Sequence, residues 1–169
     1  MKLQNLVLAI VLLCGLNANG QSVKKIISYS KGTSETRVLT LLSDNTMWWS
    51  NTTKPWAEVT KKGLPAGTEI LDIESYQKTG MVGTDTRLIL LTGDGNIFWF
   101  ATESKGWEKI ETTGLPKDRK IIDISVYVKF PGQMMEKMRL VALMADNSIW
   151  WFAPGSEWQQ LELQGLPAK

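Results

Sequence analysis

Residues 87–99 read RLILLTGDGNIFW, and close versions stand at residues 37–49 (RVLTLLSDNTMWW) and residues 139–151 (RLVALMADNSIWW). In each copy an arginine opens an apolar run, an aspartate interrupts it and a tryptophan closes the stretch. Each copy continues to another tryptophan and a Gly-Leu-Pro, which makes a unit of roughly fifty residues. Self-similarity at this period predicts a repeat architecture, because one such unit cannot bury its apolar face alone.

Each unit is predicted to form four short antiparallel strands. In the third copy, residues 122–127 alternate apolar and polar side chains, which is typical of a half-buried strand. Residues 139–144 form a nearly continuous apolar run, as expected of a strand covered on both faces. A tight turn at Asp146-Asn147 leads to a third strand at 149–152 and a fourth at 158–163. No stretch has a sustained helical period, so we expect little or no helix.

Three such units fit two all-β architectures, three blades of a β-propeller or the three lobes of a β-trefoil. The array opens on Ile26-Ile27-Ser28-Tyr29 and closes on the third Gly-Leu-Pro, so the first strand can follow the last unit around a ring. This arrangement favours the propeller. We place the repeats at approximately 24–67, 68–118 and 119–169, within a single domain over residues 21–169.

Three blades are too few to close a ring, because propellers have about four to eight. Open blades would also leave strand edges and tryptophan-rich faces uncovered, which soluble proteins avoid. We therefore expect a homodimer that completes a six-bladed ring. A stable monomer would favour the trefoil.

The repeated pattern also resembles a known family. The order Asp-x-x-Ile-Trp-Trp, Trp-x-x-Leu, Gly-Leu-Pro and Ile-x-Ile-Ser, read from Asp146 and earlier from Asp44 and Asp94, resembles tectonin-type propeller repeats. This resemblance implies a lectin-type β-propeller. In the second copy, residues 92–99 (TGDGNIFW) also look like the Asp-box of sialidase-type propellers.

The first twenty residues are predicted to be a secretory signal peptide. A positive start is followed by the apolar run 6–13 and by Ala18-Asn19-Gly20, a small-residue cleavage pattern. We expect a secreted or periplasmic protein without a transmembrane segment, because eight apolar residues are too few to span a bilayer. Lipidation at Cys14 is the less favoured alternative, since Leu13 precedes it and an ordinary cleavage pattern follows.

The residue inventory argues against catalysis. The chain has no histidine, and its single cysteine lies in the predicted signal peptide. These absences remove the commonest general base, a common nucleophile and the usual zinc ligands. The repeated aspartates are predicted to be structural, since an active site is normally built once. Asp44, Asp94 and Asp146 are expected to form turns, and Asp72 and Asp123 to cap strand ends or bond to loop amides. We expect no enzyme activity, no cofactor, no metal and, without a basic stripe, no nucleic-acid partner.

The tryptophans are the remaining functional signal. The mid-strand set, Trp49, Trp99 and Trp151, is predicted to be core. The set that opens the fourth strand should lie at the same end of the sheet as the repeated arginines; the six candidate residues are Arg37, Trp56, Arg87, Trp107, Arg139 and Trp158. An aromatic ring can bind the apolar face of a sugar, and a guanidinium can bond its hydroxyls or an acidic group. The alternative is a structural cation–π pair.

Two functions follow from these patterns. The first is a secreted, non-catalytic, lectin-like protein that binds glycans through repeated Arg/Trp sites and gains avidity from their number. The second is a protein-interaction or structural scaffold that uses its unequal loops at 30–36, 77–86 and 128–138 as a recognition surface. The longest loop contains the apolar stretch FPGQMM at residues 130–135.

Overall fold

The computed structural model describes residues 20–31, 35–51, 53–80, 83–101, 105–129 and 137–162. The signal peptide and Cys14 lie mostly or wholly outside these ranges, so those interpretations stay predictions. The three loops of the scaffold hypothesis are shorter than the predicted 30–36, 77–86 and 128–138, because strands continue to Lys31, Gly80 and Lys129 and resume at Glu35, Gly83 and Lys137; the residues between lie outside the described ranges. The chain divides into two compact units between Thr60 and Lys61, and each is described by itself. The assignment of one domain to residues 21–169 also stays a prediction.

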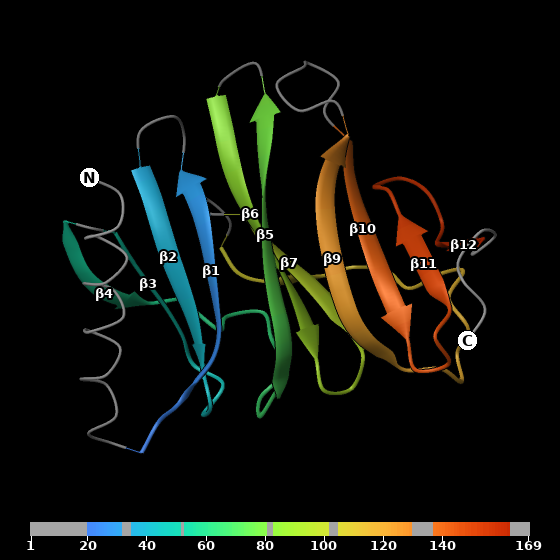
Figure 1. Cartoon of the computed structure of the whole chain (residues 1–169), viewed down its shortest axis with the longest axis horizontal. Coiled ribbons are helices and arrows are strands. Elements are labelled where there is room, and N and C mark those ends of the chain that lie inside the picture. The colour runs from blue at the N-terminus through green and yellow to red at the C-terminus, as the bar shows by residue number, and fades with distance from the viewer. Residues whose placement is uncertain are drawn as a thin grey trace. The chain divides into compact units, whose positions relative to one another are not determined.

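The first unit holds one four-stranded antiparallel sheet, with its strands in chain order (Figure 1). Its strands are β1 (Val23–Lys31), β2 (Glu35–Leu42), β3 (Met47–Asn51) and β4 (Lys54–Glu58). The predicted four-strand pattern of the first repeat is therefore confirmed.

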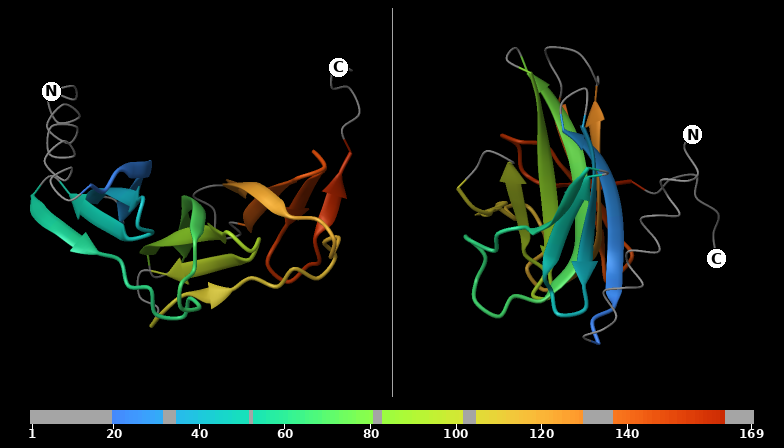
Figure 2. Two further views of the ribbon diagram at one scale, coloured as in Figure 1. Left: turned by 90° about the horizontal axis from the view of Figure 1, so that it is seen from below. Right: turned by 90° about the vertical axis from the view of Figure 1, so that its left-hand side faces the viewer.

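The second unit holds two further sheets of the same kind. The second sheet contains β5 (Ile70–Gly80), β6 (Gly83–Thr92), β7 (Ile97–Ala101) and β8 (Glu108–Lys109). The third contains β9 (Ile121–Lys129), β10 (Lys137–Met144), β11 (Ile149–Phe152) and β12 (Gln159–Leu161). Strands in each sheet twist strongly along their length (Figure 2), as L-residues require. The described residues form an all-β structure of three four-stranded antiparallel sheets and contain no helix.

The three hairpins between the second and third strands share one turn. In the first, the Leu42 amide donates to the Thr46 carbonyl at 2.9 Å, and the Asn45 amide donates back to the Leu42 carbonyl at 3.0 Å. The left-handed position is occupied by Asn45, Gly95 and Asn147, with φ of 61°, 80° and 66°. The tight turn expected from Asp-Asn and Asp-Gly is confirmed, because these residues tolerate positive φ.

The turn aspartates form the turns, as predicted, and they do so by accepting from backbone amides. Asp146 Oδ1 accepts from the Ser148 amide at 3.1 Å and from the Ser148 hydroxyl at 2.6 Å, and that hydroxyl oxygen accepts from Trp150 Nε1 at 3.0 Å. The first repeat has the same relay with Thr46 and Trp48. The hydroxyl bond from Ser148 is the main cause that lowers the pKa of Asp146. These bonds fix the third strand against its turn.

The first-strand aspartates occupy bulges. Asp72 Oδ1 accepts from the Ile73 amide at 2.8 Å, and Asp123 Oδ1 accepts from the Ile124 amide at 2.9 Å. The ladder register shifts beside Asp72 and beside Asp123. The carboxylates therefore accept hydrogen bonds from backbone amides at places where the register shift disrupts the regular pairing of the strands.

The second and third sheets pack on each other through one apolar core. The second sheet contributes Ile89, Leu91, Ile97 and Ile110, and the third contributes Ile121, Ile124, Leu140, Ala142, Met144 and Trp158. We call the face of the second sheet that carries Ile89 and Ile110 its forward face, and the face of the third sheet that carries Ile124 and Trp158 its backward face. The same two names apply to register-equivalent positions in the other sheets.

A glycine turn at the end of each of the first two repeats is hydrogen-bonded to the repeat that follows it. Gly63 and Gly114 have φ of 95° and 97° and sit in turns closed by bonds from Leu64 to Lys61 and from Leu115 to Thr112, both 3.0 Å. The carbonyl before each glycine accepts from a tryptophan amide of the next repeat: Lys62 from Trp107 at 2.7 Å, and Thr113 from Trp158 at 3.1 Å. The repeated Gly-Leu-Pro is thus a joint between repeats.

Candidate functional site

Each repeat builds the same three-residue group at one end of its sheet. The register places a first-strand tyrosine opposite a second-strand arginine in all three sheets, as Tyr29 and Arg37, Tyr76 and Arg87, and Tyr127 and Arg139. Each guanidinium lies over a third-strand tryptophan, with centroid distances of 3.9 Å for Trp49, 4.6 Å for Trp99 and 5.2 Å for Trp151. Each is a cation–π pair that holds the arginine in a fixed orientation.

The arginines pair with the third-strand tryptophans and not with the fourth-strand tryptophans that the sequence predicted. The sequence pattern pairs the arginines with the tryptophans that open the fourth strand, but Trp107 and Trp158 are 3% exposed. Their rings pack against those of Phe100 and Phe152, with centroids 5.2 and 5.3 Å apart. Trp56, at the equivalent place in the first repeat, is half-buried. The mid-strand tryptophans expected in the core are half-buried instead, beneath the arginines.

The alternation of side chains along a strand explains the correction. Arg87 lies opposite Ala101, and Leu88 lies opposite Phe100. Successive residues point to opposite faces, so Arg87 and Phe100 lie on different faces of the second sheet. Because the Trp107 ring packs against Phe100, Trp107 lies at the same end of the sheet as Arg87 but on the opposite face.

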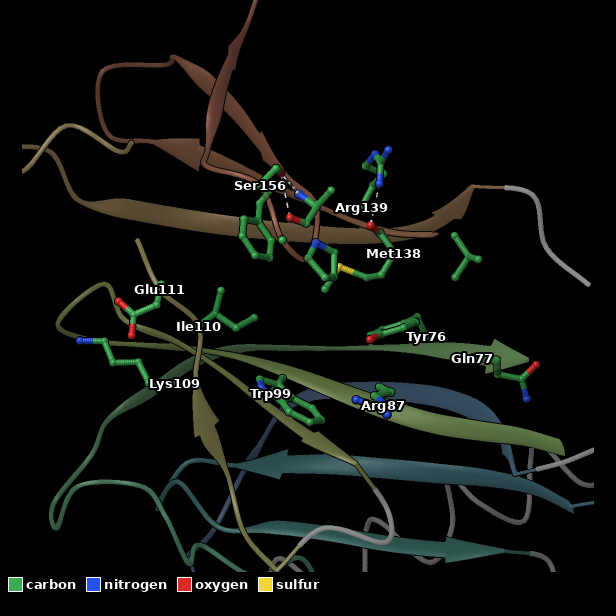
Figure 3. Close-up of a pocket in the computed structure, with 15 residues that line it drawn as sticks. Tyr76, Gln77, Arg87, Trp99, Lys109, Ile110, Glu111, Met138, Arg139 and Ser156 are labelled. Carbon is green, nitrogen blue, oxygen red and sulfur yellow. Dashed lines mark hydrogen bonds between the residues drawn. The ribbon is translucent and has the colours of Figure 1, made fainter. Parts of the chain in front are cut away.

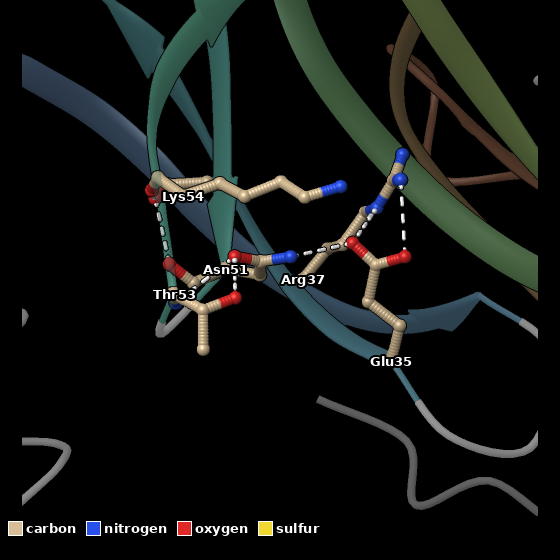
Figure 4. Close-up of polar contacts among 6 residues, drawn as sticks. Glu35, Arg37, Asn51, Thr53 and Lys54 are labelled. Atoms are coloured by element: carbon tan, nitrogen blue, oxygen red, sulfur yellow. Dashed lines mark hydrogen bonds and ion pairs between the residues drawn. The ribbon is translucent and has the colours of Figure 1, made fainter.

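The arginine of the first repeat is neutralised inside its own sheet (Figure 4). Arg37 donates to both oxygens of Glu35, at 3.0 Å from Nε and 3.2 Å from Nη2, and Asn51 Nδ2 donates to Glu35 Oε1 at 2.6 Å. These bonds, first from Arg37 and then from Asn51, lower the pKa of Glu35. Arg37 is only 8% exposed, and its guanidinium already donates to the Glu35 carboxylate.

The second repeat differs because its arginine borders a cavity. A hollow of about 780 Å³ lies between the second and third sheets, within the usual size range of ligand pockets. Its walls include Arg87, Trp99, Tyr76, Lys109, Ile110 and Glu111 from the second repeat, and Met138, Phe152 and Ser156 from the third. Figure 3 shows Arg87 beside Trp99 on one wall and Met138 on the facing wall.

The charge of the cavity comes from two described side chains, because Arg87 brings positive charge and Glu111 brings negative charge. Lys109 borders the cavity but lies opposite Phe98, so its side chain points to the other face of the second sheet. Arg139 also borders the cavity, but its guanidinium points away (Figure 3) and lies over Trp151 of its own sheet. The cavity therefore combines a planar guanidinium and a carboxylate with aromatic surface, which suits a ligand rich in hydroxyls.

Sequence reasoning missed several of these residues. Tyr76 had a signal, because a tyrosine stands at the equivalent position in the first strand of every repeat. Lys109, Glu111 and Ser156 had none, since they reach the cavity only through the packing of two sheets. Within the described ranges, no group of three His, Cys, Asp or Glu residues could hold a metal ion. Likewise, none of the described segments is a helix long and apolar enough to cross a bilayer.

Comparison with known proteins supports the fold. No protein-family model and no curated protein matches the chain. Among solved structures, a fucose lectin from Kordia zhangzhouensis in complex with methyl-fucoside matches with a TM-score of 0.55 and 16% identity, over 81% of this chain and 97% of that one. A triple arginine-to-alanine mutant of AofleA from Arthrobotrys oligospora matches with a TM-score of 0.54 and 17% identity, over 86% and 42%. A lectin from Burkholderia pseudomallei matches with a TM-score of 0.50 and 16% identity, over 80% and 39%.

Proposed function

We propose that this chain is a non-catalytic, lectin-like carbohydrate-binding protein whose three sheets are blades of a β-propeller. The observation that carries the proposal is the cavity in which Arg87, stacked on Trp99, faces the wall that contains Met138 and Phe152. The shared fold with three lectins supports it. The resemblance of the repeats to tectonin-type propellers agrees with it.

The geometry suggests how a sugar would be held. Trp99 orients the guanidinium of Arg87, whose planar fork can donate two parallel hydrogen bonds to neighbouring hydroxyls or to a carboxylate. Glu111 can accept a hydrogen bond from a sugar hydroxyl. Tyr76 and Phe152 offer aromatic surface to the apolar side of the ring.

The three repeats do not contribute equally to this proposal. Arg87 is the principal contact among the six residues expected from the sequence. Arg37 is bonded to Glu35, and Arg139 lies over Trp151 on the forward face of the third sheet. Trp107 and Trp158 support the site from the core, since both are 3% exposed.

The proposal extends to the setting of the protein. Residues 1–20 act as a signal peptide, and the mature protein is secreted or periplasmic. Two copies complete a six-bladed ring, because three blades close none. Glycans displayed outside the cell are the expected ligands.

A glycan array and one conservative substitution test the proposed function. The array should include methyl-fucoside and both neutral and acidic sugars. For whichever glycan binds, we expect Arg87→Lys to weaken affinity about tenfold, or ~1.4 kcal/mol, because lysine keeps the charge and loses the fork. Isothermal titration measures the change.

Arg119→Lys is the matched control. Arg119 is an exposed arginine that pairs with Asp146 and is not among the residues that line the cavity. It should leave the affinity unchanged. Equal losses from both substitutions would contradict the assignment of Arg87, and the absence of any bound glycan would contradict the lectin function itself.

A further inference from the structure

Equivalent positions on the forward faces are covered in two repeats and uncovered in the third. At the fourth-strand position, Val59 is 7% exposed, Ile110 is 6% and Leu161 is 46%. The three positions are equivalent because each residue pairs with the first residue of the third strand in its own sheet. The first-strand tyrosines follow the same order, with Tyr29 8% exposed and Tyr127 52%. The forward face of the third sheet is therefore an uncovered apolar surface.

The backward faces show the opposite asymmetry. Ile26, Ile73 and Ile124 occupy one position, since they pair with Thr40, Leu90 and Ala142. Ile73 is 0% exposed and Ile124 is 3%, whereas Ile26 is 49% exposed. The fourth-strand tryptophans agree with this order, because Trp107 and Trp158 are buried and Trp56 is half-buried. Here the first strand of the first sheet is exposed, while Thr40 and Leu42 of its second strand are 0% and 2% exposed on the same face.

The second and third sheets show what covers such faces. Ile110 on a forward face and Ile124 on a backward face belong to one buried core. Leu161 and Ile26 are their equivalents and keep the same apolar character. The two exposed faces are thus the two halves of a contact that the chain already makes once.

We propose that the forward face of the third sheet packs on the backward face of the first sheet of a second copy of this chain. The inference rests on the proposed propeller, because six is the multiple of three that falls within the four to eight blades of such rings. A head-to-tail contact of this kind closes after two copies, and both joints are then identical. Apolar side chains left half exposed in one copy become core in the pair.

Single charges placed on the two faces test the contact. Leu161→Arg and Ile26→Glu each change a side chain that is nearly half exposed in one copy, so each chain should still fold. In the pair each charge is buried without a partner, and the dimer dissociation constant should rise about a hundredfold or more. Light scattering at micromolar concentration should show dimers for the parent protein and monomers for both variants. Gln160→Glu, on the opposite side of β12 from Leu161, is the control and should remain dimeric.

Mixing the two variants identifies the partner. In a mixed pair, one joint is unaltered and the other brings the introduced guanidinium of one variant toward the introduced carboxylate of the other, so dimers should reappear. Should the parent protein be a monomer, should either variant remain dimeric, or should mixing restore nothing, the proposal is overturned. Glycan binding is measured separately on the monomeric variants, because the Arg87 cavity lies within one chain, so loss of the dimer and loss of the lectin function are distinguishable.

Discussion

Gly63→Ala is expected to destabilise the protein by about 3–5 kcal/mol, although it adds one methyl group. A Cβ at this position would overlap the Trp107 carbonyl oxygen and lie 2.8 Å from its amide nitrogen, both of them backbone atoms that cannot rotate away. The φ of 95° adds strain for any L-residue. The joint between repeats would have to open. Urea unfolding monitored by tryptophan fluorescence measures the loss.

Gly67→Ala separates the clash from the strain. Gly67 also has a positive φ, 73°, but a Cβ there meets nothing within 4 Å. Its substitution should cost only the conformational strain, about 1–2 kcal/mol. If Gly63→Ala costs no more than Gly67→Ala, the Gly-Leu-Pro turn is not a close joint between repeats.

Trp158→Ala is expected to cost about 3–5 kcal/mol, because it empties a buried aromatic site. Trp158 is 3% exposed, stacks on Phe152 and donates its indole N–H to the Glu111 carbonyl at 3.0 Å. Trp99→Ala should cost less, about 1–2 kcal/mol, since Trp99 is half-buried, packs against the core only as a partly buried ring and otherwise pairs with Arg87.

Two measurements on the same variants decide between the tryptophan sets. For Trp99→Ala, the loss in free energy of glycan binding should exceed the loss in free energy of unfolding. Trp158→Phe keeps an aromatic ring and loses one hydrogen bond, so it should lower the free energy of unfolding by about 1 kcal/mol. If the Trp99 variant were the less stable of the two alanine variants, the placement of these rings would be contradicted.

Much of the fold could be predicted from the repeat. Strand order followed from alternation and apolar runs, and the hairpins followed from Asp-Asn and Asp-Gly, where Asn45, Gly95 and Asn147 adopt positive φ. These features are local, and three copies of each pattern reinforced one another. Local chemistry therefore settled the arrangement within each sheet.

The candidate site was harder to predict because it depends on faces and on packing between sheets. Trp99 and Trp107 are eight residues apart, while Trp151 and Trp158 are seven apart, so the intervening loop hides which face the second tryptophan joins. Glu35 forms the ion pair with Arg37 in the first repeat, but the aligned residue of the third repeat is Lys137. The arginines of the first and third repeats therefore have different partners, although the repeated motif is the same. Lys109 and Glu111 reach the cavity only because two sheets pack together.

The most direct test of the proposed site is a titration followed through indole N–H resonances in ¹H–¹⁵N NMR spectra. The strongest binder from the glycan array is added to the mature protein, and each resonance is assigned by a Trp→Phe substitution. The proposed site predicts that the Trp99 signal moves and saturates with the ligand, because Trp99 lines the cavity, while the buried Trp158 signal stays in place. A saturating shift at Trp158 or Trp56 with no change at Trp99 would contradict the assignment of the sugar site to the Arg87 cavity.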